Sequence, residues 1–330
     1  MTPTDHIDAP ETNNPDFGLD GPNALPRGGP AIGLALGGGV ARGWAHIGAV
    51  QRLEEHGIKP DIVAGTSVGA LVGGFWLAGE LPALENWARS LTKRRMLSYV
   101  DFMLTGSGLM GGKRLQKTMA QFLGDTRIED LPTRFVAVTS ELATGHETWL
   151  RSGHLAQSLE AAYALPGVFP PRCIDDRWLI DGALINPLPI SVCRAFGARL
   201  VIAIGLHADA FGRASIQRRE KYESPDRSEA ETLVKTAKAN IAEKAVMRRL
   251  FRSNGPTPGL GSVMLASFNI VMDRITRSRL AGDPADVLIL PPVAHIPLID
   301  FDKADELIAL GRTAVDEAMP AIENALEHLA

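Results

Sequence analysis

Short apolar runs alternate with helical patterns along most of this chain. Runs without regular polar alternation predict buried strands at residues 31–36, 62–65, 135–140, 178–180, 200–205 and 286–290. Apolar positions spaced for one helix face predict helices over 43–56, 68–78, 155–164 and from 303 to the end of the chain. Strands and helices in this order predict an α/β fold, with three α/β/α layers around a mostly parallel central sheet.

The most apolar stretch, residues 62–79, carries no charge and is just long enough to imitate a membrane span. A Pro60-Asp61 break precedes it, and five glycines dilute it. We therefore predict a buried strand, a sharp turn and a buried helix here, and not a transmembrane segment.

Two segments lie outside this alternation. Residues 1–29 are rich in Pro, Asp and Asn and lack the apolar core of a signal peptide, so we expect a disordered segment before one domain at 30–330. Residues 207–261 are charged and predicted to be helical, as an insertion or a candidate lid. Their helical stripe at 229–252 leaves two interpretations open: a solvated surface helix, or a helix whose cations contact anionic lipid.

Composition narrows the function classes. The 330 residues carry a formal net charge of −4, which offers no electrostatic attraction to nucleic acid. Cys173 and Cys193 cannot form a disulfide framework, and no Cys-x-x-Cys or His-Glu-x-x-His motif supports a zinc site. We therefore expect a cytoplasmic protein without a metal site or a nucleic-acid partner.

Two glycine-rich corners carry the candidate chemistry. Each follows a predicted strand and opens a predicted helix: Gly37-Gly38-Gly39-Val40-Ala41-Arg42-Gly43 and Gly65-Thr66-Ser67-Val68-Gly69. In the second corner, Gly65 and Gly69 permit a tight turn that lifts out the Ser67 hydroxyl, and the helix N-terminus favours developing negative charge. A serine that merely caps the helix is the alternative.

The first corner fits an oxyanion loop better than a dinucleotide site. A dinucleotide fingerprint needs Gly-x-Gly-x-x-Gly and an acidic residue at the end of the second strand. Gly38 and Gly43 fit the outer positions, but Val40 occupies the middle one, and residues 64–66 contain no carboxylate. An oxyanion loop needs only backbone N–H donors, which Gly39 and Val40 both have.

The serine needs a base, and the residues leave two candidates. Asp181-Gly182 follows a predicted strand and is either a plain turn or a carboxylate whose pKa burial would have to raise. A Ser-Asp-His triad is also available, because three histidines follow Asp181: His207, His295 and His328. The early position of Ser67 and the lack of a motif around any histidine favour Asp181. His46 shares a predicted helix face with apolar residues and is expected to be packed in the core.

These motifs resemble the patatin-like phospholipase family, above all its bacterial branch that is similar to the esterase domain of neuropathy target esterase. The resemblance covers residues 31–312 in five ordered segments: 36–48, 65–69, 165–171, 181–183 and 274–287. It implies a patatin-like fold, with the domain at 30–330 as the hydrolase domain.

The resemblance also implies a catalytic dyad of Ser67 and Asp181 that needs no metal or cofactor. It assigns oxyanion binding to Gly38, Gly39, Val40 and Gly43, and supporting positions to Gly37, Arg42, Gly65, Gly69 and Gly182. Two positions depart from the family pattern. Val40 replaces a frequent glycine, and Ala162 stands where many relatives have serine.

We therefore expect a serine esterase that cleaves phospholipid or lysophospholipid esters through an acyl-enzyme. Two alternatives stay open: a hydrolase of thioesters or storage polyesters, and a non-catalytic lipid-binding module on the same fold. The expected partner is a lipid or fatty-acyl ester. A peripheral contact with the inner face of the membrane is expected if residues 207–261 form an interfacial helix.

Overall fold

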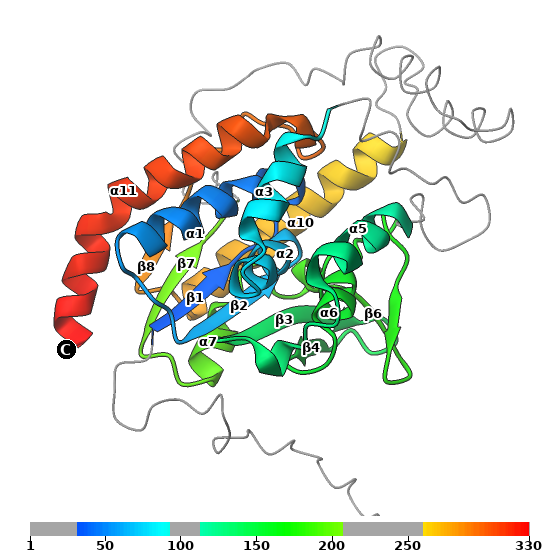
Figure 1. Ribbon diagram of the computed structural model, residues 1–330, viewed down its shortest axis with the longest axis horizontal. Helices are drawn as coiled ribbons and strands as arrows, with labels where there is room; N and C mark the ends of the chain where they lie inside the picture. Colours follow the sequence, from blue (N-terminus) through cyan, green and yellow to red (C-terminus); the bar gives the residue numbers. More distant parts are fainter. Residues whose placement is uncertain (1–31, 93–112, 207–259, 330) are drawn as a thin grey trace, which may run out of the picture.

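The computed structural model describes residues 32–92, 113–206 and 260–329, which build three layers around one eight-stranded sheet (Figure 1). The strand order is β5-β6-β3-β2-β1-β7-β8, with β4 paired to β3. The strands are β1 (Ile32–Leu36), β2 (Ile62–Thr66), β3 (Arg134–Glu141), β4 (Glu147–Leu150), β5 (Arg172–Ile174), β6 (Arg177–Asp181), β7 (Leu200–Ile204) and β8 (Val287–Ile289). The predicted α/β fold with a mostly parallel central sheet is confirmed.

The site-bearing edge of the sheet follows from the strand directions. β3, β2, β1, β7 and β8 pair in parallel, and Leu36 at the end of β1 lies between Gly65 of β2 and Ile204 of β7. β6 is antiparallel to β3, and its last residue, Asp181, pairs with Thr139. The chain places β2 on one side of β1 and β7 on the other, and loops diverge at such a switch point to leave room for a ligand.

Helices cover both faces of the sheet. They are α1 (Ala45–Glu55), α2 (Val68–Leu77), α3 (Leu81–Arg89), α5 (Lys113–Leu123), α6 (Leu155–Ala162), α7 (Ile190–Ala195), α10 (Leu260–Gly282) and α11 (Ala304–Leu329), joined in places by 3-10 turns at η1 (Val40–Trp44), η2 (Ile128–Asp130), η3 (Gly182–Leu184) and η5 (Phe301–Lys303). Leu34 and Leu36 of β1 belong to the apolar cluster shared with α1, α2, α6 and α11, and Ala35 points into the cluster shared with α7 and the end of α10.

α11 lies along α1, and their backbones touch (Figure 1). A Cβ added at Gly48 of α1 would overlap the carbonyl of Ile308, and one added at Gly311 of α11 would overlap the carbonyl of Ala45. Because protein interiors are close-packed, this double glycine contact fixes the two helices at one separation.

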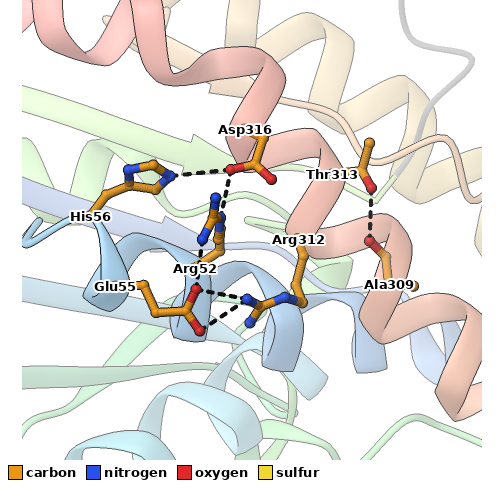
Figure 2. A network of polar contacts seen from close by, with 7 residues as sticks. All are labelled: Arg52, Glu55, His56, Ala309, Arg312, Thr313 and Asp316. Atoms are coloured by element: carbon orange, nitrogen blue, oxygen red, sulfur yellow. Dashed lines mark hydrogen bonds and ion pairs between the residues drawn. The ribbon is translucent and has the colours of Figure 1, made fainter.

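Ion pairs surround the same helix contact on the solvent side. Figure 2 shows Arg52 of α1 between Glu55 and Asp316, at 2.8 and 2.5 Å, and Arg312 of α11 at 2.7 Å from Glu55. His56 lies 3.1 Å from the same Asp316 carboxylate. Exposed pairs of this kind contribute little individually, but here they link the two helices that glycine packing brings together.

Within residues 32–92, 113–206 and 260–329, every strand and helix predicted from the sequence is present, with ends shifted by a residue or two. Residues 62–79 form β2, a turn and α2 as predicted, and no described helix is long and apolar enough to cross a membrane. The sequence did not predict α3, α5, α7, α10, β4 and β5. α7 and β5 span only six and three residues, too few for a periodic signal.

The predictions for residues 1–29 lie outside the described residues. So does almost all of the predicted insertion at 207–261, including the apolar stripe at 229–252. Only its last residues are described, and they belong to the first turn of α10.

Candidate active site

Ser67 occupies the sharp turn between β2 and α2. Its backbone angles, φ 56° and ψ −126°, are strained for a residue with a side chain, and its side chain makes no capping bond to α2. The hydroxyl instead donates a hydrogen bond of 2.7 Å to Oδ2 of Asp181. The capping alternative is therefore wrong. The strained backbone of Ser67 instead directs its hydroxyl toward the Asp181 carboxylate.

Backbone contacts too close for a side chain hold this corner. A Cβ at Gly65 would overlap the backbone of Ala70, and a Cβ at Gly69 would overlap the carbonyl of Leu36 at the end of β1. The same Cβ would lie 2.7 Å from the carbonyl oxygen of Gly37. The first turn of α2 thus rests directly on the start of the glycine loop, and the two predicted corners form one unit.

Asp181 is the last residue of β6, which is separated by β3 from β2, the strand that leads into Ser67. It is 1% exposed, its Oδ1 accepts the Ala183 N–H at 2.9 Å, and its own N–H donates to the carbonyl of Ala164 at 3.0 Å. Burial raises the pKa of Asp181 to about 7, while the hydrogen bonds from Ser67 and Ala183 act in the opposite direction. A plain turn would explain the bond to Ala183, but it does not explain the bond to Ser67, which is 114 residues away in the sequence.

The segment that follows Asp181 is held by Gly182, which the sequence predicted as a supporting position, and by Arg279 and Glu147, which it did not predict as site residues. A Cβ at Gly182 would overlap the carbonyl of Val138, which fixes the segment against β3. Arg279 of α10 donates to the carbonyl of Ile185 at 2.9 Å and pairs with Glu147 at 3.2 Å. Arg279 lies in the 274–287 segment that resembles the family. This resemblance was the only feature of the sequence that pointed to a role for Arg279.

A second contact joins this segment to the serine corner. The Thr66 hydroxyl, one residue before Ser67, donates to the carbonyl of Asn186 at 2.9 Å. The Asn186 amide in turn donates to Glu147 at 2.8 Å. The two residues of the candidate dyad therefore share a support as well as a hydrogen bond.

The glycine loop passes over Ser67, and a Cβ at Gly38 would lie 3.3 Å from the Ser67 Cβ. The N–H groups of Gly37 and Gly38 are used by the fold, donating to Ile204 at 3.0 Å and to Pro187 at 2.9 Å. Within the described part of the chain, the N–H groups of Gly39 and Val40 have no acceptor. Of the predicted oxyanion donors, these two are left available.

The exit of the loop adds strain and packing. Val40 has φ 52°, a left-handed conformation that a β-branched residue rarely adopts. Gly43 lies in η1, where a Cβ would overlap the Val68 side chain, so this glycine lets η1 pack on α2. The valine in the position of a frequent glycine therefore keeps the glycine-like backbone.

Arg42 ties the loop to a segment far away in the sequence. Its guanidinium donates to the carbonyl of Ile296 at 2.8 Å through Nε and to that of Ala294 at 2.9 Å through Nη2. The neighbouring Ala41 N–H donates to the carbonyl of Leu298 at 3.1 Å. The predicted motif arginine thus anchors the loop to the segment at 294–298.

No described histidine hydrogen-bonds to Ser67 or Asp181. His46 is buried as expected, and burial lowers its pKa to about 4. His295 pairs with Glu306 at 2.9 Å, and His328 lies in α11. His207 is outside the described residues. The described residues also contain no group of three His, Cys, Asp or Glu side chains that could hold a metal ion.

Comparison with known proteins identifies the family of this chain. The model of the patatin-like phospholipase family matches residues 34–194. An uncharacterized NTE family protein of Mycobacterium tuberculosis is 33% identical over 337 residues, which cover 89% of this chain and 92% of that protein.

Two animal proteins align over a smaller share of their own length. Neuropathy target esterase of Drosophila melanogaster is 34% identical over 183 residues, 53% of this chain and 13% of that protein. A patatin-like phospholipase domain-containing protein of Caenorhabditis elegans is 36% identical over 296 residues, 86% of this chain and 20% of that protein. The resemblance drawn from the sequence is confirmed, and the chain belongs to the patatin-like phospholipase family, among its NTE family members.

Proposed function

We propose that this protein is a serine hydrolase of phospholipid or lysophospholipid esters, with Ser67 and Asp181 as its catalytic dyad. Membership of the family implies lipid ester hydrolysis. The observation that carries the finer proposal is the 2.7 Å hydrogen bond from the Ser67 hydroxyl to a buried carboxylate. The two available amides of Gly39 and Val40 support it.

Acylation begins when Ser67 Oγ forms a bond to the ester carbonyl carbon. Its proton passes along the existing hydrogen bond to Asp181 Oδ2, and the carbonyl electron pair moves onto oxygen. The N–H groups of Gly39 and Val40 then bind this oxyanion, where removal of one such donor typically costs about 10²–10³ in kcat. Collapse breaks the ester C–O bond, and the leaving alkoxide takes the proton from Asp181.

Deacylation repeats the same proton path with water. Water attacks the acyl carbon as Asp181 Oδ2 accepts its proton. Collapse of the second tetrahedral intermediate releases the fatty acid and returns the proton to Ser67 Oγ. No step needs a histidine, because the one carboxylate serves both half-reactions.

Burial is what makes a carboxylate a competent base here. An ordinary aspartate, with a pKa near 3.9, is a weak proton acceptor, and the best catalytic pKa lies close to the working pH. Burial raises the pKa of Asp181 to about 7. The hydrogen bond to Ser67 keeps the carboxylate aimed at the proton that it has to receive.

Labelling with a fluorophosphonate probe tests the proposal. We expect the wild-type protein to be labelled on Ser67, and the Ser67→Ala variant to lose both the label and hydrolysis of a panel of phospholipids and lysophospholipids. Ser158→Ala, which removes a buried hydroxyl from α6, is the matched control and keeps both. A folded wild-type protein without the label would contradict the enzyme proposal.

The same panel separates the alternatives. Cleavage of thioesters or storage polyesters, with phospholipids left intact, would keep the Ser67 chemistry and replace the substrate. Binding of lipid vesicles by the unlabelled protein would instead support a non-catalytic lipid-binding module.

A further inference from the structure

His46 is a buried polar residue on an otherwise apolar stretch of α1. Its ring Nε2 lies 2.7 Å from the carbonyl oxygen of Gly37. A carbonyl oxygen only accepts, so Nε2 carries the proton and donates it. The other ring nitrogen, Nδ1, is buried with no hydrogen-bond partner among the described residues.

This hydrogen bond falls on the first peptide of the glycine loop. The carbonyl of Gly37 accepts from His46, and the N–H of Gly38 on the same peptide donates to Pro187 at 2.9 Å. Because a peptide unit is planar, holding its C=O and its N–H fixes the orientation of the whole plane. The two available amides, at Gly39 and Val40, follow directly after this fixed plane.

The donor itself is held rigidly. His46 lies between Ala45, whose carbonyl touches Gly311 of α11, and Ile47 in the core. The hydrogen bond also links the start of the loop, Gly37, to α1, the helix that follows the loop and η1 in the chain. The loop is therefore held by the helix into which it leads.

We propose that His46 is a positioning residue for ester hydrolysis, whose Nε2–H fixes the Gly37–Gly38 peptide so that the Gly39 and Val40 amides face the developing oxyanion. The inference rests on the proposed function of Ser67. It differs from a triad, because the imidazole acts on the loop backbone and neither receives nor supplies the reacting proton.

Core packing alone does not explain a histidine here. An imidazole with one unpartnered ring nitrogen is costly to bury, and a leucine fills apolar space without that cost. The hydrogen bond to Gly37 is the one contact that leucine cannot reproduce. A packing role and a positioning role therefore predict opposite orders for two variants.

The test compares His46→Gln with His46→Leu on a short-chain p-nitrophenyl ester. The Gln amide can donate in place of Nε2, whereas Leu has no donor. We expect His46→Leu to lower kcat by about a hundredfold with KM nearly unchanged, as for a small misplacement of catalytic groups. We expect His46→Gln to stay within about threefold of the wild type, since its donor restores the same bond.

Inhibition by an alkyl boronic acid, which forms a tetrahedral adduct with serine, supplies a second readout. Its affinity should fall in parallel with kcat for His46→Leu and recover in His46→Gln. His328→Leu is the matched control, because that exposed histidine also bonds a carbonyl, of Asn324 in α11, away from the loop. If His46→Leu does not fold, His46→Asn, whose shorter amide does not reach Gly37, replaces it.

The possible failures are distinguishable. If Ser67→Ala retains wild-type activity, the proposed function fails, whatever the His46 variants do. If activity depends on Ser67 while His46→Leu hydrolyses and binds boronate like the wild type, or better than His46→Gln, the positioning role of His46 is refuted.

Discussion

The two glycine corners at the sheet edge are built in different ways. The Ser67 corner is held by close backbone contacts, in which glycines at 65 and 69 leave no room for a Cβ. The loop at 37–43 is held mainly by hydrogen bonds, from His46 and from Arg42 to carbonyl groups. The Ser67 corner is therefore fixed by steric exclusion, and the loop at 37–43 mainly by polar anchors.

This difference separates two kinds of sensitivity. Added atoms disrupt a corner that is held by close packing, so substitutions there should lower the free energy of unfolding. A loop held by polar anchors can lose one of them while the fold stays intact, so we expect the rate of catalysis to change first. Activity and stability measured on the same variants test this separation.

The largest expected effect is at Asp181, whose carboxylate accepts the hydrogen bond from Ser67. Asp181→Asn should lower hydrolysis by at least about a thousandfold, because the amide cannot accept the Ser67 proton. The same variant should be more stable than the wild type above pH 7. Activity assays and thermal unfolding at several pH values check both statements.

The sign follows from the raised pKa. Burial takes the pKa of Asp181 from 3.8 to about 7, so between these values the folded protein keeps a proton that the unfolded chain has lost. The stabilising contribution is full below pH 3.8 and is lost as the pH rises through about 7. The Asp181→Asn variant has no titrating group at this position, so its stability does not fall in this way. Ser67→Ala is the comparison variant, since it should lose activity without this gain in stability.

The second effect breaks the steric corner. Gly69→Ala places a methyl group against the carbonyls of Leu36 and Gly37, and overpacking of this kind costs about 3 kcal/mol or more. Urea unfolding measures the loss. Gly282→Ala is the matched control, because a Cβ there meets nothing within 4 Å. Equal stabilities of the two variants would contradict the steric account.

The pH dependence of the rate sharpens the comparison further. With Asp181 as base, kcat/KM for a neutral ester should fall about tenfold per pH unit below pH 7 and level off above it. The loop side adds no second step near neutrality, because burial lowers the pKa of His46 to about 4. Two inflections between pH 5 and 8 would speak against a base that consists of Asp181 alone.

A smaller effect is expected when one polar anchor is removed. Arg42→Met loses the hydrogen bonds to Ala294 and Ile296, and we expect about a tenfold fall in kcat with KM retained, from a loosened loop. Its melting temperature should change far less than that of Gly69→Ala. Arg127→Met removes a more exposed arginine that pairs locally with Glu129, and it should leave the rate unchanged.

The smallest effect concerns the ion pairs between α1 and α11. Hydrogen bonds from Arg312 and Arg52 lower the pKa of Glu55 to about 2. Its contribution is therefore present above pH 4.5 and is lost as the pH falls through about 2. Glu55→Gln should lower the melting temperature slightly near pH 7, and about 1 M salt should remove the difference. Glu327→Gln in α11 is the control.

The sequence predicted the steric corner well because its determinants are neighbours in the chain. Gly65, Ser67 and Gly69 fall within five residues, and the strand before them and the helix after them are both strongly apolar. The motif at Asp181 was found for the same reason. The residues favoured Asp181 as the base for Ser67, and the family resemblance implied the dyad. The strand at 178–180 was predicted, but its antiparallel pairing with β3, which brings Asp181 to Ser67, has no local signal.

The polar anchors could not be predicted in the same way. Arg42 was named as a motif position, but its carbonyl partners lie more than 250 residues later, in a loop without periodicity. His46 was expected in the core, and its partner Gly37 became visible only once the loop was folded. The Gly38 N–H was predicted to bind an oxyanion, but in the structure it donates a hydrogen bond to the carbonyl of Pro187. Every residue has a backbone carbonyl, so the amino-acid sequence does not indicate which carbonyls accept these hydrogen bonds.

The long-range anchoring of the loop also sets an order on biosynthesis. The ribosome completes the Ser67 corner early, but the carbonyls that hold Arg42, and the α11 backbone that packs on α1, are made only after residue 290. A nascent chain would therefore carry the proposed nucleophile, Ser67, well before the proposed oxyanion loop is anchored. The proposed ester hydrolysis would become possible only when α11 has emerged and docked on α1.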